Sequence, residues 1–482
     1  MERRDFLAAG IALPGALGAV VRGRSPRADD RFDALAQLVA DKMGEHGIPG
    51  AALGVVKDGR LQMRGLGVTS VEDPRAVTTD TVFELASLSK TVTATAAMRL
   101  VEQGRLDLDA PIHRYLPTFR VQDEAASAAV TLRNLLTHSA GWEASYSVPD
   151  LGREALGRWV PAMGELIQLA PPGSIWSYNN NGYGLAGHLI EIVTGKDVRD
   201  AFRELVFAPL ALDRASTRLE DIVTWPLTVG HRPGRDGAAE VVRPYSMGSS
   251  IPAGGVNMSL ASLMKYAAFH LGEHDGVGEG ALGRATRAAM RVPQLRKEPT
   301  GEAMGIGWHL RTLGGVLTAA HGGTAGAGHR CHLQIVPDRR LGFAILTNHT
   351  EGWRLLQAVE RATLRAYEGL ALAPNQPICG YRGHSETLDH VTALAVQPPA
   401  AQYAGRYERA PGQVTELRAG AGGELLTGDG EQLARVLFYG PDIAYLAGGP
   451  NAGTNHEFIR GPAGGSVRWM RVGGQIARKV PG

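Results

Sequence analysis

The sequence contains little of what would build a disulfide framework, a cysteine zinc site or a nucleic-acid-binding surface. It has two cysteines in 482 residues, too few for a disulfide scaffold or for a zinc site of four cysteines. Its charges nearly cancel, with 50 lysines and arginines against 48 aspartates and glutamates, so no net positive field would gather nucleic acid. Hydrophobic residues make up 44% of the chain and charged residues 20%, which is typical of a folded globular protein. We therefore expect a packed protein without a nucleic-acid partner.

The N-terminal segment differs from the rest of the chain. Arg3 and Arg4 precede an apolar, uncharged stretch over residues 6–21. This stretch is shorter than the roughly 20 residues that a membrane-spanning helix needs. Paired arginines before a short apolar core predict a twin-arginine-type export signal over residues 1–28, and hence a periplasmic or secreted protein. No later segment is long and apolar enough to predict a stable membrane span.

Two scarce residue types are informative where they occur. In an oxidising compartment Cys331 and Cys379 could form a disulfide, although the sequence does not give the distance between them. Of the 50 lysines and arginines, seven are lysines and 43 are arginines. Because arginine is the usual cation in this chain, a lysine in an apolar segment indicates a role that arginine cannot fill. Arginine does not deprotonate and therefore cannot serve as a base.

The order of the predicted elements divides the chain into two folded parts. Residues 30–370 contain strand pairs at 51–68 and 331–347, on either side of a mainly helical middle. The simplest packing is an α/β (α+β) fold in which these strands form one antiparallel sheet flanked by helices, with a helical second lobe and a cleft between them. Residues 371–400 hold four prolines and predict a linker, and the short strands between glycine turns in residues 401–482 predict a small, barrel-like all-β domain. The main helices are expected at residues 32–46, 88–103, 185–193, 260–271 and 353–367.

The pattern Ser-x-x-Lys occurs twice, as Ser87/Lys90 and as Ser262/Lys265. On a helix this spacing puts the hydroxyl beside the amine, and an uncharged amine can accept the hydroxyl proton. Residues 91–98 carry no charge on any face, so the helix around Lys90 is expected to be buried, with Ser87 in its first turn. Ser262 and Lys265 lie outside the apolar stripe of their helix, which indicates a solvated surface. For the first pair, a catalytic role and a structural role both remain open on this pattern alone.

Two polar clusters follow along the chain. Tyr178 and Asn180 lie in an asparagine-rich segment before an apolar helix; the phenol could carry a proton, and the amide could hold the lysine amine and a substrate carbonyl. The alternative is a buried tyrosine beside asparagines in turns. The second cluster, His321 to Thr324, comes just before the strand expected at 331. There Gly323 would let a substrate approach, the Thr324 N–H could face an oxyanion, and His321 could position the substrate. The alternative is an ordinary glycine-rich loop.

Two other readings of the sequence are weaker. Residues 137–141 resemble a Gly-x-Ser-x-Gly nucleophile elbow with its first glycine replaced, which would make Ser139 the nucleophile. An elbow should follow a strand, whereas residues 132–136 are typical of the end of a helix. His321, His329 and His332 match no common zinc spacing, so no metal is expected.

The order Ser-x-x-Lys, Tyr-x-Asn, His-x-Gly resembles that of the serine β-lactamase and DD-peptidase-like hydrolases, which recognise penicillin. The similarity is to the branch that holds class C β-lactamases, D-aminopeptidases, D-peptidases and esterases. It covers roughly residues 30–370, and the tail looks like the small β domain appended to some members. Connecting segments that also look like this family are residues 83–86, 104–109, 115–117, 135–141, 252–255 and 305–308.

The resemblance implies an activity and assigns roles in catalysis. It implies a serine hydrolase that cleaves a small ester, amide or peptide in two steps, without a cofactor. Ser87 would be the acylated nucleophile, Lys90 its activating partner and Tyr178 the proton carrier. The alternative is a sensor that binds penicillin or cell-wall peptides with little turnover, in which the β tail recognises a partner.

The resemblance also implies roles in substrate binding. Asn180 would position Lys90 and the substrate, and the N–H groups of Ser87 and Thr324, beside Gly323, would form the oxyanion hole. His321 departs from typical class C β-lactamases, which carry lysine at this position and use it to bind the carboxylate of the antibiotic. Histidine there is more similar to D-aminopeptidases, D-peptidases and esterases. The resemblance leaves open the choice between ester, D-peptide and β-lactam, the oligomeric state and the role of the tail.

Overall fold

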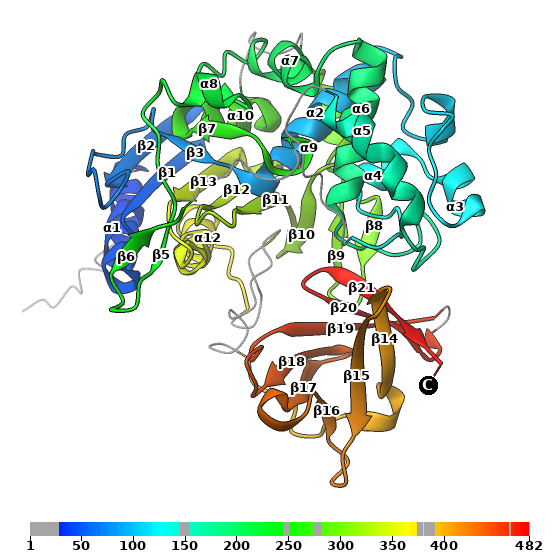
Figure 1. The fold of residues 1–482 in the computed structure, drawn as a ribbon. Coiled ribbons are helices and arrows are strands. Elements are labelled where there is room, and N and C mark those ends of the chain that lie inside the picture. The colour runs from blue at the N-terminus through cyan, green and yellow to red at the C-terminus, as the bar shows by residue number, and fades with distance from the viewer. Residues whose placement is uncertain are drawn as a thin grey trace, which may run out of the picture.

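A computed structural model describes residues 28–144, 154–243, 251–273, 281–373, 379, 391–461 and 464–481. The predicted export segment lies outside these residues, apart from Ala28, which begins the first helix, and export stays a prediction. Most of the predicted linker lies outside them as well. The described residues form an α/β domain and a C-terminal barrel that lies below it in Figure 1.

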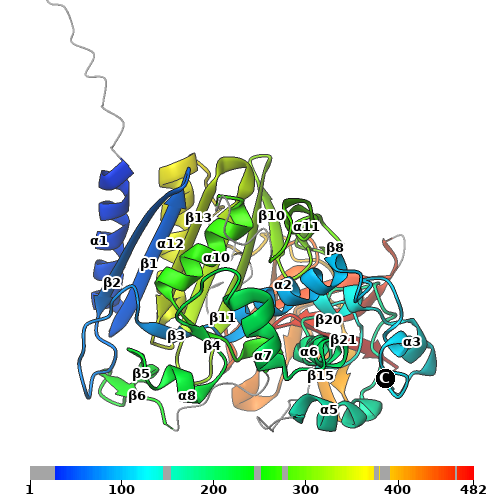
Figure 2. The same cartoon turned by 90° about the horizontal axis from the view of Figure 1, so that it is seen from above.

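One large antiparallel sheet organises the first domain, in the order β2-β1-β13-β12-β11-β10-β9-β8. Side chains alternate across it: Leu53 and Val55 of β1 pack with α1 and α12, whereas Ala52 and Val56 pack on the opposite side, where α10 lies (Figure 2). Burial on both faces explains why β1 and β13 are nearly continuous apolar runs. The strands are β1 (Gly50–Lys57), β2 (Arg60–Gly67), β8 (Leu295–Lys297), β9 (Glu302–Met304), β10 (His309–Leu313), β11 (Val316–Thr324), β12 (Arg330–Val336) and β13 (Leu341–Thr347).

Helices cover both faces of the sheet and build a second lobe beside it (Figure 1). Helix α2 runs through the centre of this lobe, and each of its residues 89–98 is buried, as its lack of charge predicts. Helix α10 begins after Ser259, whose side chain accepts the N–H of Ser262. The helices are α1 (Ala28–His46), α2 (Ser89–Glu102), α3 (Glu124–Ala129), α4 (Leu132–Leu136), α5 (Ala155–Trp159), α6 (Asn180–Thr194), α7 (Val198–Phe202), α8 (Leu219–Ile222), α9 (Ile251–Gly254), α10 (Leu260–Leu271), α11 (Arg284–Ala289) and α12 (Gly352–Glu368). Two small sheets join β3 (Val82–Glu84), β7 (Asn257–Ser259) and β4 (Ala215–Ser216), and β5 (His231–Pro233) and β6 (Ala239–Val241).

The C-terminal part is a closed barrel of eight antiparallel strands, which confirms the predicted barrel-like domain. Its interior is filled by side chains, among them Tyr403, Phe438 and Phe458, whose rings lie 4.5–5.5 Å apart. The strands are β14 (Gly405–Ala410), β15 (Gln413–Ala419), β16 (Leu425–Thr427), β17 (Ala434–Gly440), β18 (Ile443–Ala447), β19 (Asn455–Arg460), β20 (Val467–Val472) and β21 (Gln475–Val480). The sequence did not predict β14.

The predicted fold is confirmed, and two local alternatives that the sequence left open need correction. His321 to Thr324 do not form a loop; they are the end of strand β11, paired with β12. Cys331 and Cys379 form no disulfide: both are free and buried.

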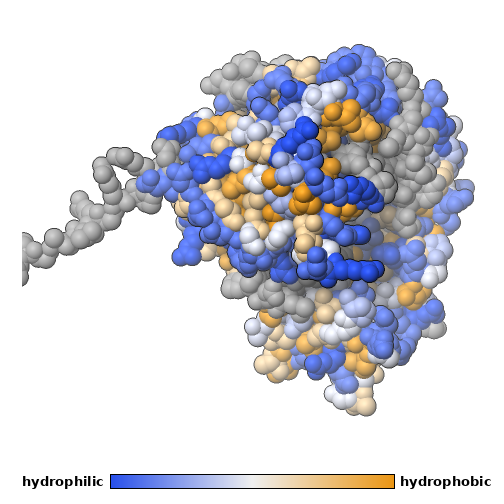
Figure 3. Space-filling view, turned by 60° about the vertical axis from the view of Figure 1, so that its left-hand side comes forward, coloured by the Kyte–Doolittle hydropathy of each residue, from blue (hydrophilic) through white to orange (hydrophobic). Residues whose placement is uncertain are grey.

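On the face shown in Figure 3, hydrophobic residues lie between hydrophilic ones. None of the helices among the described residues has the length and hydropathy needed to cross a membrane.

Candidate active site

Ser87 lies in a tight turn between strand β3 and the buried helix α2. The turn is the 3-10 helix η1 (Ala86–Leu88). Ala86 has a φ of 44°, a left-handed conformation that costs a non-glycine residue roughly 1–2 kcal/mol. The N–H of Leu85 donates to the carbonyl of Val256 (2.9 Å), which fixes the chain just before the turn. Ser87 is left partly exposed while the residues on both sides of it are buried.

Lys90 reaches the hydroxyl of Ser87 from one helical turn further along. Its Nζ lies 3.1 Å from Ser87 Oγ, and its side chain is 0% exposed. Nζ also donates to the carbonyl of Ala253 (2.7 Å) in α9, and it lies 4.8 and 5.6 Å from the ring centres of Tyr178 and Tyr183. The amine is therefore shielded from water and directed at the hydroxyl.

Tyr178 completes the group on the other side of Ser87. Its hydroxyl donates to Ser87 Oγ over 2.7 Å. Ser87 Oγ thus contacts both the amine of Lys90 and the phenol of Tyr178, residues that come from separate segments of the chain. The structure brings these three predicted residues together.

His138 holds the main chain on either side of Tyr178, a role that was not predicted from the sequence. Its carbonyl accepts the N–H of Ser177 (2.8 Å), and its Nδ1 accepts the N–H of Asn179 (3.0 Å). The two rings of His138 and Tyr178 lie 4.4 Å apart. Because Nδ1 accepts a hydrogen bond, the neutral imidazole carries its proton on Nε2. A positive φ of 56° at His138 directs its carbonyl and its ring to the same neighbouring segment. The sequence signal is a single histidine beside a serine, too common to predict this role.

Strand β11 forms the remaining wall of the site. A Cβ on Gly323 would lie 2.1 Å from the carbonyl oxygen of Leu85 and 2.5 Å from Cys331 Sγ. Only glycine therefore lets β11 lie against the turn that carries Ser87. The next residue, Thr324, ends the strand and is exposed. The predicted oxyanion donors of Ser87 and Thr324 thus lie on segments in direct contact.

His321 is buried in β11, beside a buried ion-pair network. Its Nδ1 lies 2.7 Å from the carbonyl of Gly322, so Nδ1 carries a proton and Nε2 is the acceptor in the neutral ring. The ring packs on His309 at 5.0 Å, and His309 Nδ1 lies 3.1 Å from Lys297 Nζ. Lys297 in turn pairs with Glu302.

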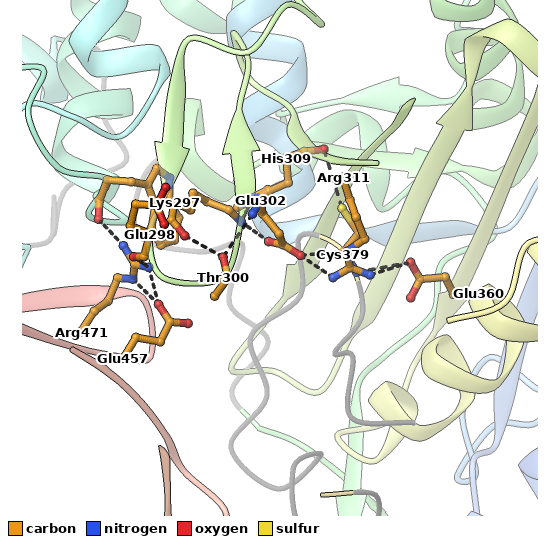
Figure 4. Close-up of polar contacts among 11 residues, drawn as sticks. Lys297, Glu298, Thr300, Glu302, His309, Arg311, Glu360, Cys379, Glu457 and Arg471 are labelled. Atoms are coloured by element: carbon orange, nitrogen blue, oxygen red, sulfur yellow. Dashed lines mark hydrogen bonds and ion pairs between the residues drawn. The ribbon is translucent and has the colours of Figure 1, made fainter. Parts of the chain in front are cut away.

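The network continues from Glu302 through Arg311 toward Glu360 in α12 (Figure 4). Burial alone would raise the pKa of Glu302, but Lys297 and Arg311 hold it at about 2. Burial raises the pKa of Glu360 to about 7. These charges lie behind β11 and compensate one another within the protein interior.

Other predicted candidates lie outside this cluster. Ser139 is buried and shares hydrogen bonds with Thr137 Oγ1 (2.8 Å) and the amide of Asn134. Lys265 donates to the carbonyl of Ala211 and to Asp213 rather than to Ser262. Contrary to the expected solvated face, Ser262 is itself buried.

Asn180 is more exposed than Ser87. Asn180 begins helix α6 and is exposed, and its predicted role in positioning Lys90 stays a prediction. Its contact with a substrate stays a prediction.

Burial raises the pKa of the Cys331 thiol, and it raises that of Cys379 to about 12, so neither is a nucleophile near neutral pH. Among the described residues, no group of three or more histidines, cysteines or acids could hold a metal ion.

Comparisons with known proteins show the family of the first domain. The family model described as Beta-lactamase matches residues 35–367. Penicillin-binding protein 4 of Amycolatopsis lactamdurans is 35% identical over 330 residues, which cover 66% of this chain and 84% of that protein. Esterase EstB of Burkholderia gladioli is 28% identical over 347 residues, which cover 63% of this chain and 86% of that protein.

A solved structure extends the similarity to the barrel. The crystal structure of SurE superposes with a TM-score of 0.77 at 27% identity, over 93% of this chain and 99% of that one. A second structure, SurE with D-Leu, gives a TM-score of 0.71 with the same coverage. The two-domain arrangement is therefore shared with a known protein.

Proposed function

The chain belongs to the beta-lactamase family of serine hydrolases, and on this premise we propose that it cleaves an ester or amide bond through an acyl-enzyme on Ser87. The observation that carries the proposal is the convergence of Lys90 Nζ and Tyr178 OH on Ser87 Oγ, at 3.1 and 2.7 Å. Nucleophile and base within hydrogen-bond reach are what covalent catalysis requires.

The geometry supports a sequence of proton movements. Burial disfavours the charged form of an amine, which supports Lys90 as the group that takes the Ser87 proton. Ser87 Oγ then attacks the carbonyl carbon, and the N–H groups of Ser87 and Thr324 stabilise the oxyanion. Tyr178, which contacts the same oxygen, gives its own proton to the leaving group, and the Lys90 ammonium returns a proton to Tyr178. In the second step a water gives a proton to Lys90 and attacks the acyl carbonyl; the bond to Ser87 Oγ breaks, that oxygen takes a proton back, and the acid is released.

For the substrate class, we propose a small ester or a peptide that contains a D-amino acid. The support is the similarity to an esterase and to a protein solved with D-Leu. His321 supports the same choice, because typical class C β-lactamases carry at this position a lysine that binds the carboxylate of the antibiotic, whereas this chain carries a histidine.

The second candidate is a sensor that is acylated but turns over little. It is favoured by the relative named penicillin-binding protein. The two candidates differ in the fate of the acyl-enzyme, because a sensor keeps its acyl group whereas a hydrolase releases it. A stoichiometric burst without later turnover would therefore support the sensor.

The test is a side-by-side assay of a short-chain p-nitrophenyl ester, a D-alanyl amide and a chromogenic cephalosporin. We expect continuous turnover of the ester or of the amide, and little of the cephalosporin. Ser87→Ala should abolish turnover. Ser139→Ala serves as the matched control and should retain turnover. Cephalosporin hydrolysis faster than that of the other two would contradict the proposed substrate class. Full activity of Ser87→Ala would contradict the mechanism.

We also propose that the protein is exported, on the strength of Arg3 and Arg4 before the apolar residues 6–21. Replacement of both arginines by lysine should leave the protein in the cytoplasmic fraction of its host. Unchanged fractionation would contradict a twin-arginine signal.

A further inference from the structure

The last two strands of the barrel contact the segment that carries Tyr178. The N–H of Tyr178 donates to the carbonyl of Gly474 (2.7 Å), in the turn between β20 and β21. The N–H of Ile476 donates to Ser177 Oγ (3.2 Å), one residue earlier. The barrel therefore binds the main chain at the residue whose phenol touches Ser87.

Arg471 of β20 is the main polar anchor of this contact. Its side chain is 2% exposed, and it donates to the carbonyls of Trp176 (3.1 Å) and Glu298 (2.6 Å). Within the barrel it pairs with Glu457 (Figure 4). The guanidinium also lies 4.8 Å from the Trp176 ring, against which Lys297 packs at 4.9 Å. One arginine thus joins the barrel to the segment before Tyr178 and to the turn that follows β8.

An apolar seam lies beside these polar contacts. The side chains of Leu169, Ala170, Ile175, Ile459 and Ile476 pack together and are buried. At its edge, Nε1 of Trp469 donates to the carbonyl of Leu169 (2.9 Å). The contact therefore combines buried apolar side chains with directed hydrogen bonds.

We propose that the β20–β21 hairpin is a positioning element for Tyr178, with Arg471 as its anchor, so that the barrel is part of the active site. The inference rests on the proposed function, because it assigns Tyr178 its role there. His138 holds Tyr178 from the first domain, and the hairpin holds the same residue from the opposite domain. A displacement of about 1 Å in a catalytic group can cost on the order of 10²-fold in rate. A barrel that only blocked the cleft would have the opposite effect, since loosening it would raise the rate.

The experiment compares Glu457→Gln with the double variant Glu457→Gln/Arg471→Met in the full-length protein. Glu457→Gln is the background because it prevents an unpaired carboxylate when Arg471 is removed. The measurements are kcat and KM for a p-nitrophenyl ester, and the second-order rate at which a fluorophosphonate labels Ser87. We expect the double variant to lose about 10- to 100-fold in kcat and in labelling rate, with KM little changed.

The matched control is Arg460→Met, which breaks an ion pair with Asp442 inside the barrel. The described contacts of Arg460 all lie within residues 402–465, so this change weakens the barrel without touching the first domain. We expect a lower melting temperature with wild-type kcat and labelling rate. If the double variant and Arg460→Met lose activity only in proportion to melting temperature, Arg471 is merely structural and the proposal is wrong.

Trp469→Phe provides a second variant, should the double variant fail to fold. It keeps an aromatic side chain but removes the hydrogen bond to Leu169 and part of the indole packing on the seam, and we expect labelling about fivefold slower. Wild-type labelling of Trp469→Phe would overturn the proposal, and faster labelling would overturn it in favour of a blocking barrel. Wild-type protein labelled at a residue other than Ser87 would instead overturn the proposed function itself.

Discussion

Gly323→Ala tests whether the close contact between β11 and the turn before Ser87 is required. The added Cβ would meet the carbonyl oxygen of Leu85 at 2.1 Å and the sulfur of Cys331 at 2.5 Å. Nonbonded heavy atoms prefer a separation of about 3.5 Å, so the strand or the turn must move by about 1 Å. The carbonyl belongs to the main chain two residues before Ser87, and a rotamer change cannot relieve that contact.

Two magnitudes follow from this displacement. Overpacking of this kind costs about 1–3 kcal/mol of folding free energy, so the variant should still fold. A shift of about 1 Å between Ser87 and Thr324 should reduce kcat/KM on the order of 10²-fold, because both oxyanion donors must face one oxygen. The change should therefore affect activity far more than stability.

The assay is kcat/KM for a p-nitrophenyl ester together with the thermal melting temperature. The matched control is Gly326→Ala, which adds the same methyl group where nothing lies within 4 Å, and it should behave as the wild type. Adding Cys331→Ala to Gly323→Ala should restore only part of the activity, since the contact with Leu85 remains. Wild-type kcat/KM in Gly323→Ala would refute the reasoning.

Three further predictions concern the nucleophile, the base and the pH dependence of stability. Ser139→Ala and Ser262→Ala should keep wild-type kcat/KM, at a cost of about 1 kcal/mol each in unfolding free energy, and loss of turnover in either would point to another nucleophile. Lys90→Arg should reduce kcat by at least about 10²-fold, because a guanidinium does not release its proton; near-normal kcat would exclude Lys90 as base. Burial lowers the pKa of both His332 and His456 to about 4, from an ordinary value near 6.5, so the unfolded chain takes up protons first as the pH falls. The stability contributed by these two histidines should be complete above pH 6.5 and be lost between pH 6.5 and 4, by up to about 3 kcal/mol each. Glu360, whose pKa burial raises to about 7, offsets part of this loss; a melting temperature that rises as the pH falls from 6.5 to 4 would contradict the prediction.

The elements that were predicted well from the sequence are those whose apolar residues are the ones that the fold buries. Helix α10 was expected at 260–271 and lies there, because its apolar stripe repeats with the helical period and Ser259 caps it. Strands β1 and β13 are nearly continuous apolar runs, and their predicted bounds lie within a residue or two of the observed ones. In such segments local pattern and tertiary environment agree.

The missed elements are those whose burial depends on distant partners. Strand β10 buries His309 and Arg311, and Arg311 is accommodated by Glu302 on β9. A search for apolar periodicity does not detect a strand whose buried side chains are charged. Strand β11 is not predicted from the sequence, and its glycines at 322 and 323 also fit a loop, whereas Gly323 admits the turn before Ser87.

The candidate site shows the same division. Ser87, Lys90 and Tyr178 were predicted from motif order, and they lie in contact. His138, the carbonyl of Ala253 and the carbonyl of Gly474 were not predicted. The last two contribute main-chain atoms, which carry no signature in the side-chain sequence, and His138 acts through a left-handed turn.

The most direct test of the account is to identify the residue that becomes acylated. Full-length protein would be incubated with a fluorophosphonate, digested, and mapped by tandem mass spectrometry. The account predicts one adduct, on Ser87, that is absent from Ser87→Ala and forms far more slowly in Lys90→Arg. An adduct on Ser139 or any other residue, or one that forms on Ser87 at the wild-type rate in Lys90→Arg, would contradict it.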